Sequence, residues 1–119
     1  MTRIEIAGTD LVVHVEGLDK YFALKSELRV PLEHVAGVEH AADEARTWFH
    51  GFRAPGTNIP GVLTAGTFYH HEGRVFWDVH DAAGAIAILL HDETYAKLVI
   101  EVADPEATIA AIEAALPHP

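Results

Sequence analysis

The chain contains no cysteine, and serine and methionine each occur once among its 119 residues. Without cysteine, neither a disulfide framework nor a thiolate metal site is possible. The lone serine, Ser26, lacks the Gly-x-Ser-x-Gly context of a hydrolase nucleophile. No glycine-rich loop leads into a helix. The sequence therefore predicts no catalytic motif, no dinucleotide or phosphate-loop site, and no cofactor.

Basic residues are also scarce. Eight Lys and Arg face 18 Asp and Glu, which gives a formal net charge of −10. Such a surplus of negative charge repels the phosphates of nucleic acids and the anionic leaflet of a membrane. We therefore expect no nucleic-acid partner and disfavour recruitment to membrane lipids.

Long apolar runs are missing. The longest, residues 82–90, is interrupted by Gly84 and is much shorter than the roughly 20 residues that span a bilayer. The N-terminal segment MTRIEIAGTD lacks the charged region and apolar core of a secretory signal. Together with the absence of cysteine, these features predict a cytoplasmic protein.

Half of the residues are hydrophobic, which suits one compact domain over residues 1–119. Polar and apolar residues alternate in short segments, which predicts about seven β-strands. At the C-terminus, Asp104, Pro105 and Glu106 form a typical helix start, and apolar residues then recur at helical spacing up to Leu116. We expect a mainly β (α+β by count), seven-stranded antiparallel barrel or sandwich capped by one C-terminal α-helix.

Turn signals predict hairpins at three places, residues 8–10, 71–73 and 81–84. Pro31 favours the first position of a helical turn, so we expect a single helical turn at residues 31–35.

The middle of the chain, residues 53–69 (RAPGTNIPGVLTAGTFY), combines two Pro-Gly turn signals with three glycines. We interpret it as the crossover between the earlier and later strands. Thr57 and Asn58 are its polar side chains best able to contact a ligand, so they mark a possible binding loop. Trp48 is a further candidate, because it and its neighbour Phe49 cannot both face inward on one strand. The alternative is that this segment only reverses the chain.

The stretch RVPLEHVAGV at residues 29–38 resembles the bacterial pleckstrin-homology-like (PH-like) domains, in which a strand runs into a proline-containing turn and then another strand. The C-terminal stretch LVIEVADPEATIAAIEAAL is similar to their last strand and helix. The resemblance implies a seven-stranded, two-sheet barrel capped by the helix. Their eukaryotic relatives often bind phosphoinositides through a basic loop between the first two strands. Here that loop is Gly8-Thr9-Asp10, without Lys or Arg, which disfavours this activity.

Nine histidines are present. Asp78 and His80 share one face of a predicted strand, and a metal site would combine them with His91 and either His70 or His71. The alternative is that these are surface residues. We likewise expect the carboxylates of the alternating strands, Asp78 and Glu101 among them, to face solvent.

Our leading hypothesis is a non-enzymatic binding or assembly module, whose partner is another protein or a second copy of the chain. The alternative is a small metal-binding protein or enzyme that uses Asp78, His80 and nearby histidines. A third function, recruitment to membrane lipids, is disfavoured by the net charge.

Overall fold

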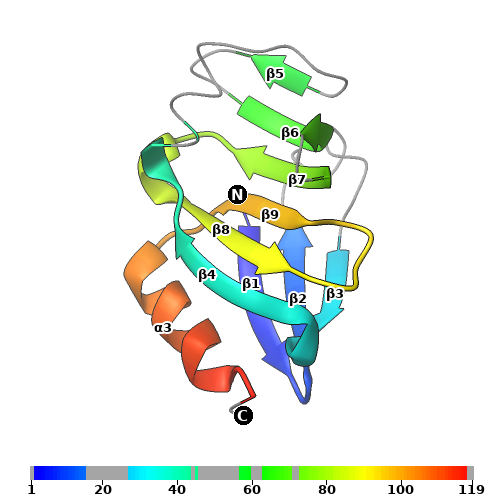
Figure 1. The fold of residues 1–119 in the computed structure, drawn as a ribbon. Helices are drawn as coiled ribbons and strands as arrows, with labels where there is room; N and C mark the ends of the chain where they lie inside the picture. The colour runs from blue at the N-terminus through cyan, green and yellow to red at the C-terminus, as the bar shows by residue number, and fades with distance from the viewer. Residues whose placement is uncertain are drawn as a thin grey trace.

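Figure 1 presents the computed structural model, which describes residues 2–15, 27–43, 45, 57–59, 63–70 and 73–117. These residues form two sheets. The first has the order β1 (Thr2–Ala7), β2 (Asp10–Val15), β3 (Glu27–Pro31). The second has the order β4 (Val35–His40), β8 (Ala85–Leu90), β9 (Lys97–Glu101), β7 (Gly73–Val79), β6 (Leu63–His70), β5 (Thr57–Ile59). Two 3-10 turns, η1 (Leu32–His34) and η2 (Ala82–Gly84), precede β4 and β8, and α3 (Pro105–Ala115) follows β9.

The first sheet is an antiparallel meander that begins with a tight hairpin. Ala7 pairs with Asp10, so only Gly8 and Thr9 connect β1 to β2. Gly8 has φ +66°, a left-handed conformation that glycine adopts without a side-chain clash. Leu11, Val13 and Val15 are buried and His14 is partly exposed, as the alternation predicts, but Val12, on the same face as His14, is buried as well.

The chain passes from the first sheet to the second through the corner at η1. Pro31 ends β3 and has no N–H with which to continue a strand ladder. The amide of Leu32 instead donates to the carbonyl of Thr9 at 2.9 Å, which joins η1 to the β1–β2 turn. The predicted single helical turn after Pro31 is therefore confirmed as a 3-10 turn.

The second sheet corrects the expectation of a wholly antiparallel fold, because β7 and β9 pair in parallel. We expected residues 81–84 to form a hairpin loop, which would place β8 next to β7. Instead, β8 lies two positions away from β7 in the sheet, and β9 lies between the two strands. Neighbouring strands lie about 4.8 Å apart, so the chain must cross about 10 Å between β7 and β8, which a two-residue hairpin turn does not span. The His80–Gly84 connection provides that length.

The apolar residues form two clusters on the two faces of the second sheet. One lies between the sheets and includes Phe76, Ile86, Leu98 and Ile112. The other lies on the opposite face, around Trp77 and Val99. The central strands are thus buried on both faces. Helix α3 contacts β4, β1 and β8, so it covers the open side between the two sheets (Figure 1).

The mainly β fold with a C-terminal helix is confirmed, but it is not a closed barrel, since the described strands of the two sheets do not pair with one another. The described residues form nine strands where the sequence predicts about seven. Part of the difference is β5, which lies in the segment that we interpreted as the crossover.

The expectation that Asp78 and Glu101 face solvent is wrong. Asp78 is fully buried and Glu101 is 7% exposed. Both lie on strands whose two faces are covered, so alternation along the strand does not separate a buried face from an exposed one.

Candidate binding site

The described residues do not bring the predicted metal ligands together. Asp78 pairs with Ile100 near the end of β9, and His80 follows it. His91 follows β8, whose Leu89 pairs with Lys97 at the start of β9, and His70 pairs with Gly73 at the start of β7. These two histidines therefore lie at the opposite end of the sheet from Asp78. His71 lies outside the described residues. Within the described part of the chain, no group of three or more His, Asp or Glu is arranged to hold a metal ion.

The buried carboxylates instead have partners that connect elements of the fold. The hydroxyl of Thr2 on β1 donates to Asp78 Oδ2 at 3.3 Å, which links the two sheets. Glu101 Oε1 accepts hydrogen bonds from the backbone amides of His80 at 2.7 Å and Asp81 at 3.0 Å. These contacts give both carboxylates a structural role.

The possible binding loop lies at the far edge of the second sheet. Thr57 and Asn58 belong to β5, where their backbones pair with Ala65 and Thr64. In Figure 1, β5 lies at the end of the molecule opposite η1. Trp48 lies outside the described residues. A role of Thr57, Asn58 and Trp48 in binding stays a prediction.

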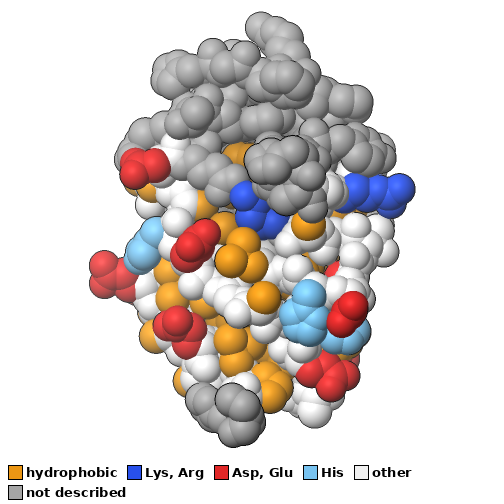
Figure 2. All heavy atoms as spheres, viewed as in Figure 1, with side chains coloured by type: hydrophobic (Ala, Val, Ile, Leu, Met, Phe, Trp, Pro, Cys, Tyr) orange, Lys and Arg blue, Asp and Glu red, His pale blue; other side chains and the backbone are white. Residues whose placement is uncertain are grey.

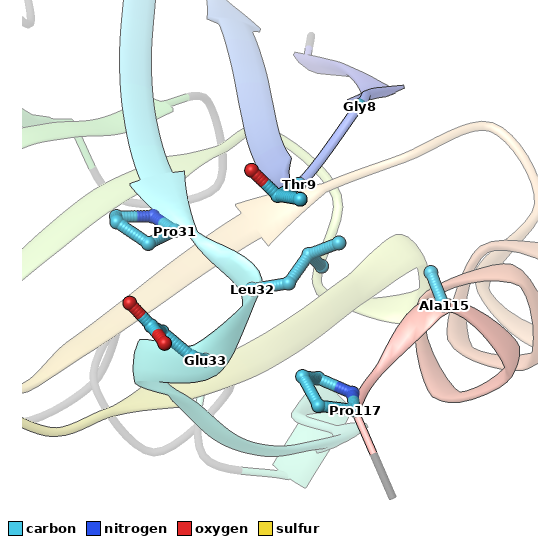
Figure 3. Close-up of a pocket in the computed structure, with 7 residues that line it drawn as sticks. All are labelled: Gly8, Thr9, Pro31, Leu32, Glu33, Ala115 and Pro117. Carbon is cyan, nitrogen blue, oxygen red and sulfur yellow. The ribbon is translucent and has the colours of Figure 1, made fainter.

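A pocket of about 340 Å³ opens at the other end, where the β1–β2 turn, η1 and the end of α3 meet. Its volume falls at the lower end of the range of small-ligand pockets. In Figure 3, Leu32 extends from η1 between Thr9 and Ala115, while the Glu33 carboxylate lies on the Pro31 side. The pocket is lined by Gly8, Thr9, Pro31, Leu32, Glu33, Ala115 and Pro117.

The electrostatics of this pocket favour positive charge. Glu33 is exposed, and its carboxylate makes no hydrogen bond or ion pair with the described residues. Nearby Asp10, by contrast, accepts from Arg29 at 3.1 Å. At the other side of the pocket, α3 ends without a basic residue in its last turn, and Pro117 has no N–H to offer the last carbonyls. A helix carboxyl end carries a partial negative charge.

A cluster of ionisable side chains adjoins the pocket at η1. His34 Nδ1 and Glu93 Oε2 lie 2.5 Å apart, and the rings of His34 and His91 have centroids 5.8 Å apart. The hydrogen bond to Glu93 raises the pKa of His34 above its usual value, and the charges of Glu33 and Asp92 act in the same direction. Figure 2 shows histidine and acidic side chains together at this corner.

The sequence predicts the Pro31–Val35 turn and the glycine turn at residue 8. It does not predict that both turns line one pocket. The Leu32–Thr9 hydrogen bond joins residues 23 positions apart, and the lining residues Ala115 and Pro117 come from the end of the chain. His34 and Glu93 are 59 residues apart, so no residue spacing in the sequence predicts their contact either. The one available signal was the acidic residue Glu33, two positions after Pro31 in the motif that carries the PH-like resemblance.

Comparisons of the chain with protein-family models, with curated proteins and with solved structures give no match. Within the described residues, no helix has both the length and the apolar character that crossing a bilayer requires.

Proposed function

We propose that this protein is a non-enzymatic binding module, and that the pocket at the η1 corner holds a segment of a partner protein. The single observation that carries the proposal is the pocket itself, about 340 Å³ in volume and built from three separate parts of the chain. Its lining combines apolar surface from Ala115 and two prolines with one carboxylate, and contains no nucleophile–base pair. Such a lining suits recognition of a ligand more than its conversion.

The fold supports a relation to the bacterial PH-like domains, which stays a proposal. A three-stranded sheet faces a larger sheet, and a C-terminal helix covers the open side between them. The parallel pairing of β7 with β9 departs from the antiparallel arrangement that we expected. A cytoplasmic location is likewise a proposal and is supported by the lack of cysteine in the sequence.

A partner other than a second copy is favoured by charge. Two copies would each bring a formal net charge of −10 to the interface, and they would repel one another. Self-association remains an outcome of the test.

A positional-scanning library of hexapeptides, probed with the purified protein, tests this function. We expect a subset of peptides to bind, and Thr9→Trp to abolish that binding, because Thr9 is exposed and a bulky side chain there would fill the pocket. The backbone carbonyl of Thr9 still accepts from Leu32 in this variant, so the corner keeps its connection. Far-UV circular dichroism checks that the variant is folded.

The proposal is wrong if no peptide binds, or if the folded Thr9→Trp variant binds the same peptides equally well. Light scattering at micromolar concentration adds a second readout. A dimer that the Thr9→Trp substitution dissociates would identify the partner as another copy of this chain and would overturn the choice of a different protein.

A further inference from the structure

We infer that the segment held in this pocket presents a basic side chain, with its aliphatic stem over the apolar lining at Pro31, Ala115 and Pro117 and its charged group at Glu33. This inference rests on the proposed function and names the chemistry of the partner.

The lining of the pocket separates an apolar part from a charged part. Figure 3 shows Leu32 between Glu33 on one side and Ala115 and Pro117 on the other. A lysine or arginine side chain has the same division, with a flexible hydrocarbon stem and a charged end. A bare metal ion would leave the apolar part of the pocket unused, and the described residues offer it no group of three ligands.

Two independent features supply negative charge at the pocket. The first is the Glu33 carboxylate, which lacks an ion pair with the described residues, whereas Asp10 and Glu93 are already paired with Arg29 and His34. The second is the carboxyl end of α3, an 11-residue helix with no basic residue in its last turn. The partial negative charge of that helix end attracts a cation or the N–H donors of a peptide backbone.

N–H donors alone do not distinguish a protein segment from a free amine, because the ammonium groups of an alkyl diamine are donors as well. The amide of Leu116 already serves the carbonyls of Ile112 and Glu113, while Pro117 contributes no donor at the helix end. A peptide can donate its own neutral backbone N–H groups there while its basic side chain reaches Glu33, whereas a diamine would place a second charged group there. The proposed function already places a protein segment in the pocket, so the occupant to which we commit is a basic segment of another protein.

Fluorescence anisotropy with a fluorescein-labelled peptide, Ala-Ala-Lys-Ala-Ala with blocked ends, tests the inference. Its counterpart carries norleucine in place of lysine, which keeps the hydrocarbon stem and removes the charge. We expect the norleucine peptide to bind roughly fivefold more weakly, since exposed ion pairs contribute up to about that factor. Glu33→Gln should weaken binding of the lysine peptide by a similar factor and leave the norleucine peptide unchanged.

Glu39→Gln is the matched control, because Glu39 is an exposed carboxylate on β4 that does not line the pocket. This variant removes the same charge from the whole molecule and should bind the lysine peptide like the unmodified protein. Added salt should reduce binding of the lysine peptide and not that of the norleucine peptide.

Equal binding of the two peptides, or no effect of Glu33→Gln, would overturn the inference. If library peptides still bind in a manner blocked by Thr9→Trp, the proposed function stands and only the basic side chain is wrong. If 1,5-diaminopentane displaces the labelled peptide as effectively as the unlabelled peptide does, the occupant is a free amine and the choice of a protein segment is overturned.

Discussion

His34 connects two elements that are distant in the chain, because its imidazole lies 2.5 Å from the carboxylate of Glu93 in the β8–β9 turn. The backbone supports the same contact, since the amide of His91 donates to the carbonyl of His34 at 2.9 Å. The turn itself contains Asp92 at φ +57°, a conformation that Asp tolerates better than most residues. The position of His34 therefore depends on both side-chain and backbone contacts.

The pair of His34 and Glu93 predicts a pH dependence of stability. The pKa of His34 is raised in the folded state, so the folded protein holds this proton to a higher pH than the unfolded chain does. The stabilisation is fully present below the unfolded pKa of about 6.5 and is lost as the pH rises through the folded pKa. Urea unfolding between pH 5.5 and 8.5 should show that Glu93→Gln reduces stability at the acidic end and has less effect at the basic end.

His40→Gln is the control for this measurement, since His40 is exposed on β4 and is remote from Glu93 in the sheet. It should leave the difference between the two ends of the pH range as it is in the unmodified protein. An effect of Glu93→Gln that is the same at every pH would contradict the assignment to His34.

For single residues, the sequence indicated which side chains are of interest but not whether they are buried. It drew attention to the histidines and to Asp78, but placed Asp78 on a solvent-facing side. The structure buries Asp78 completely, because residues from distant parts of the chain cover both faces of β7. Which residues cover a strand is decided by sheet order, and a local pattern of polar and apolar residues does not contain that information.

Among the elements, local sequence signals gave correct predictions where the contacts join residues that are close together in the chain. Asp104 accepts from the amide of Ala107 at 3.1 Å and Pro105 begins α3, as the sequence predicts. The antiparallel pairings of β1 with β2 and of β6 with β7 were also predicted correctly. The β7–β8 connection was not, because its outcome depends on β9, which comes later in the chain and pairs with both strands.

Glu101 provides a test of that connection. Its Oε1 accepts two backbone hydrogen bonds from His80 and Asp81, just before η2. Glu101→Ala removes the acceptor for both amides and should lower the free energy of unfolding by about 2 kcal/mol. Thermal or urea unfolding measures this loss.

Glu101→Gln serves as the matched variant, because a Gln side-chain oxygen can accept the same two hydrogen bonds. We expect it to retain most of the stability that Glu101→Ala loses. A loss of equal size in the two variants would mean that the charge of Glu101, and not its role as acceptor, stabilises the η2 connection.

For the whole molecule, the contact between Thr2 and Asp78 joins the first strand of one sheet to β7 of the other, 76 residues away. Thr2→Val keeps the shape of the side chain but removes the donor, so one buried carboxylate oxygen loses a hydrogen bond. We predict a decrease of about 1 kcal/mol in the free energy of unfolding, measured by urea titration.

Thr2→Ser retains the hydroxyl and should be closer to the unmodified protein in the same titration. If Thr2→Val is at least as stable as the unmodified protein, the hydrogen bond between the sheets does not contribute to stability. Other contacts, among them the apolar cluster between the sheets and those of α3, would then hold the two-sheet arrangement.

The arrangement of the whole molecule also creates the pocket, which no single element contains. The β1–β2 turn, η1 and the end of α3 meet because Pro31 directs the chain out of the first sheet and α3 returns along β4 and β1. The sequence predicted each of the three parts. It did not predict their meeting, because that depends on how the two sheets and the helix pack.

The central claim is that this corner binds a partner segment, and amide chemical-shift mapping of the ¹⁵N-labelled protein tests it most directly. On titration with the tightest hexapeptide from the library, we predict that the largest shifts occur at Gly8, Thr9, Leu32 and Glu33, and that Thr57 and Asn58 in β5 do not shift. Shifts concentrated at β5, or the absence of any shift at the η1 corner, would contradict the claim.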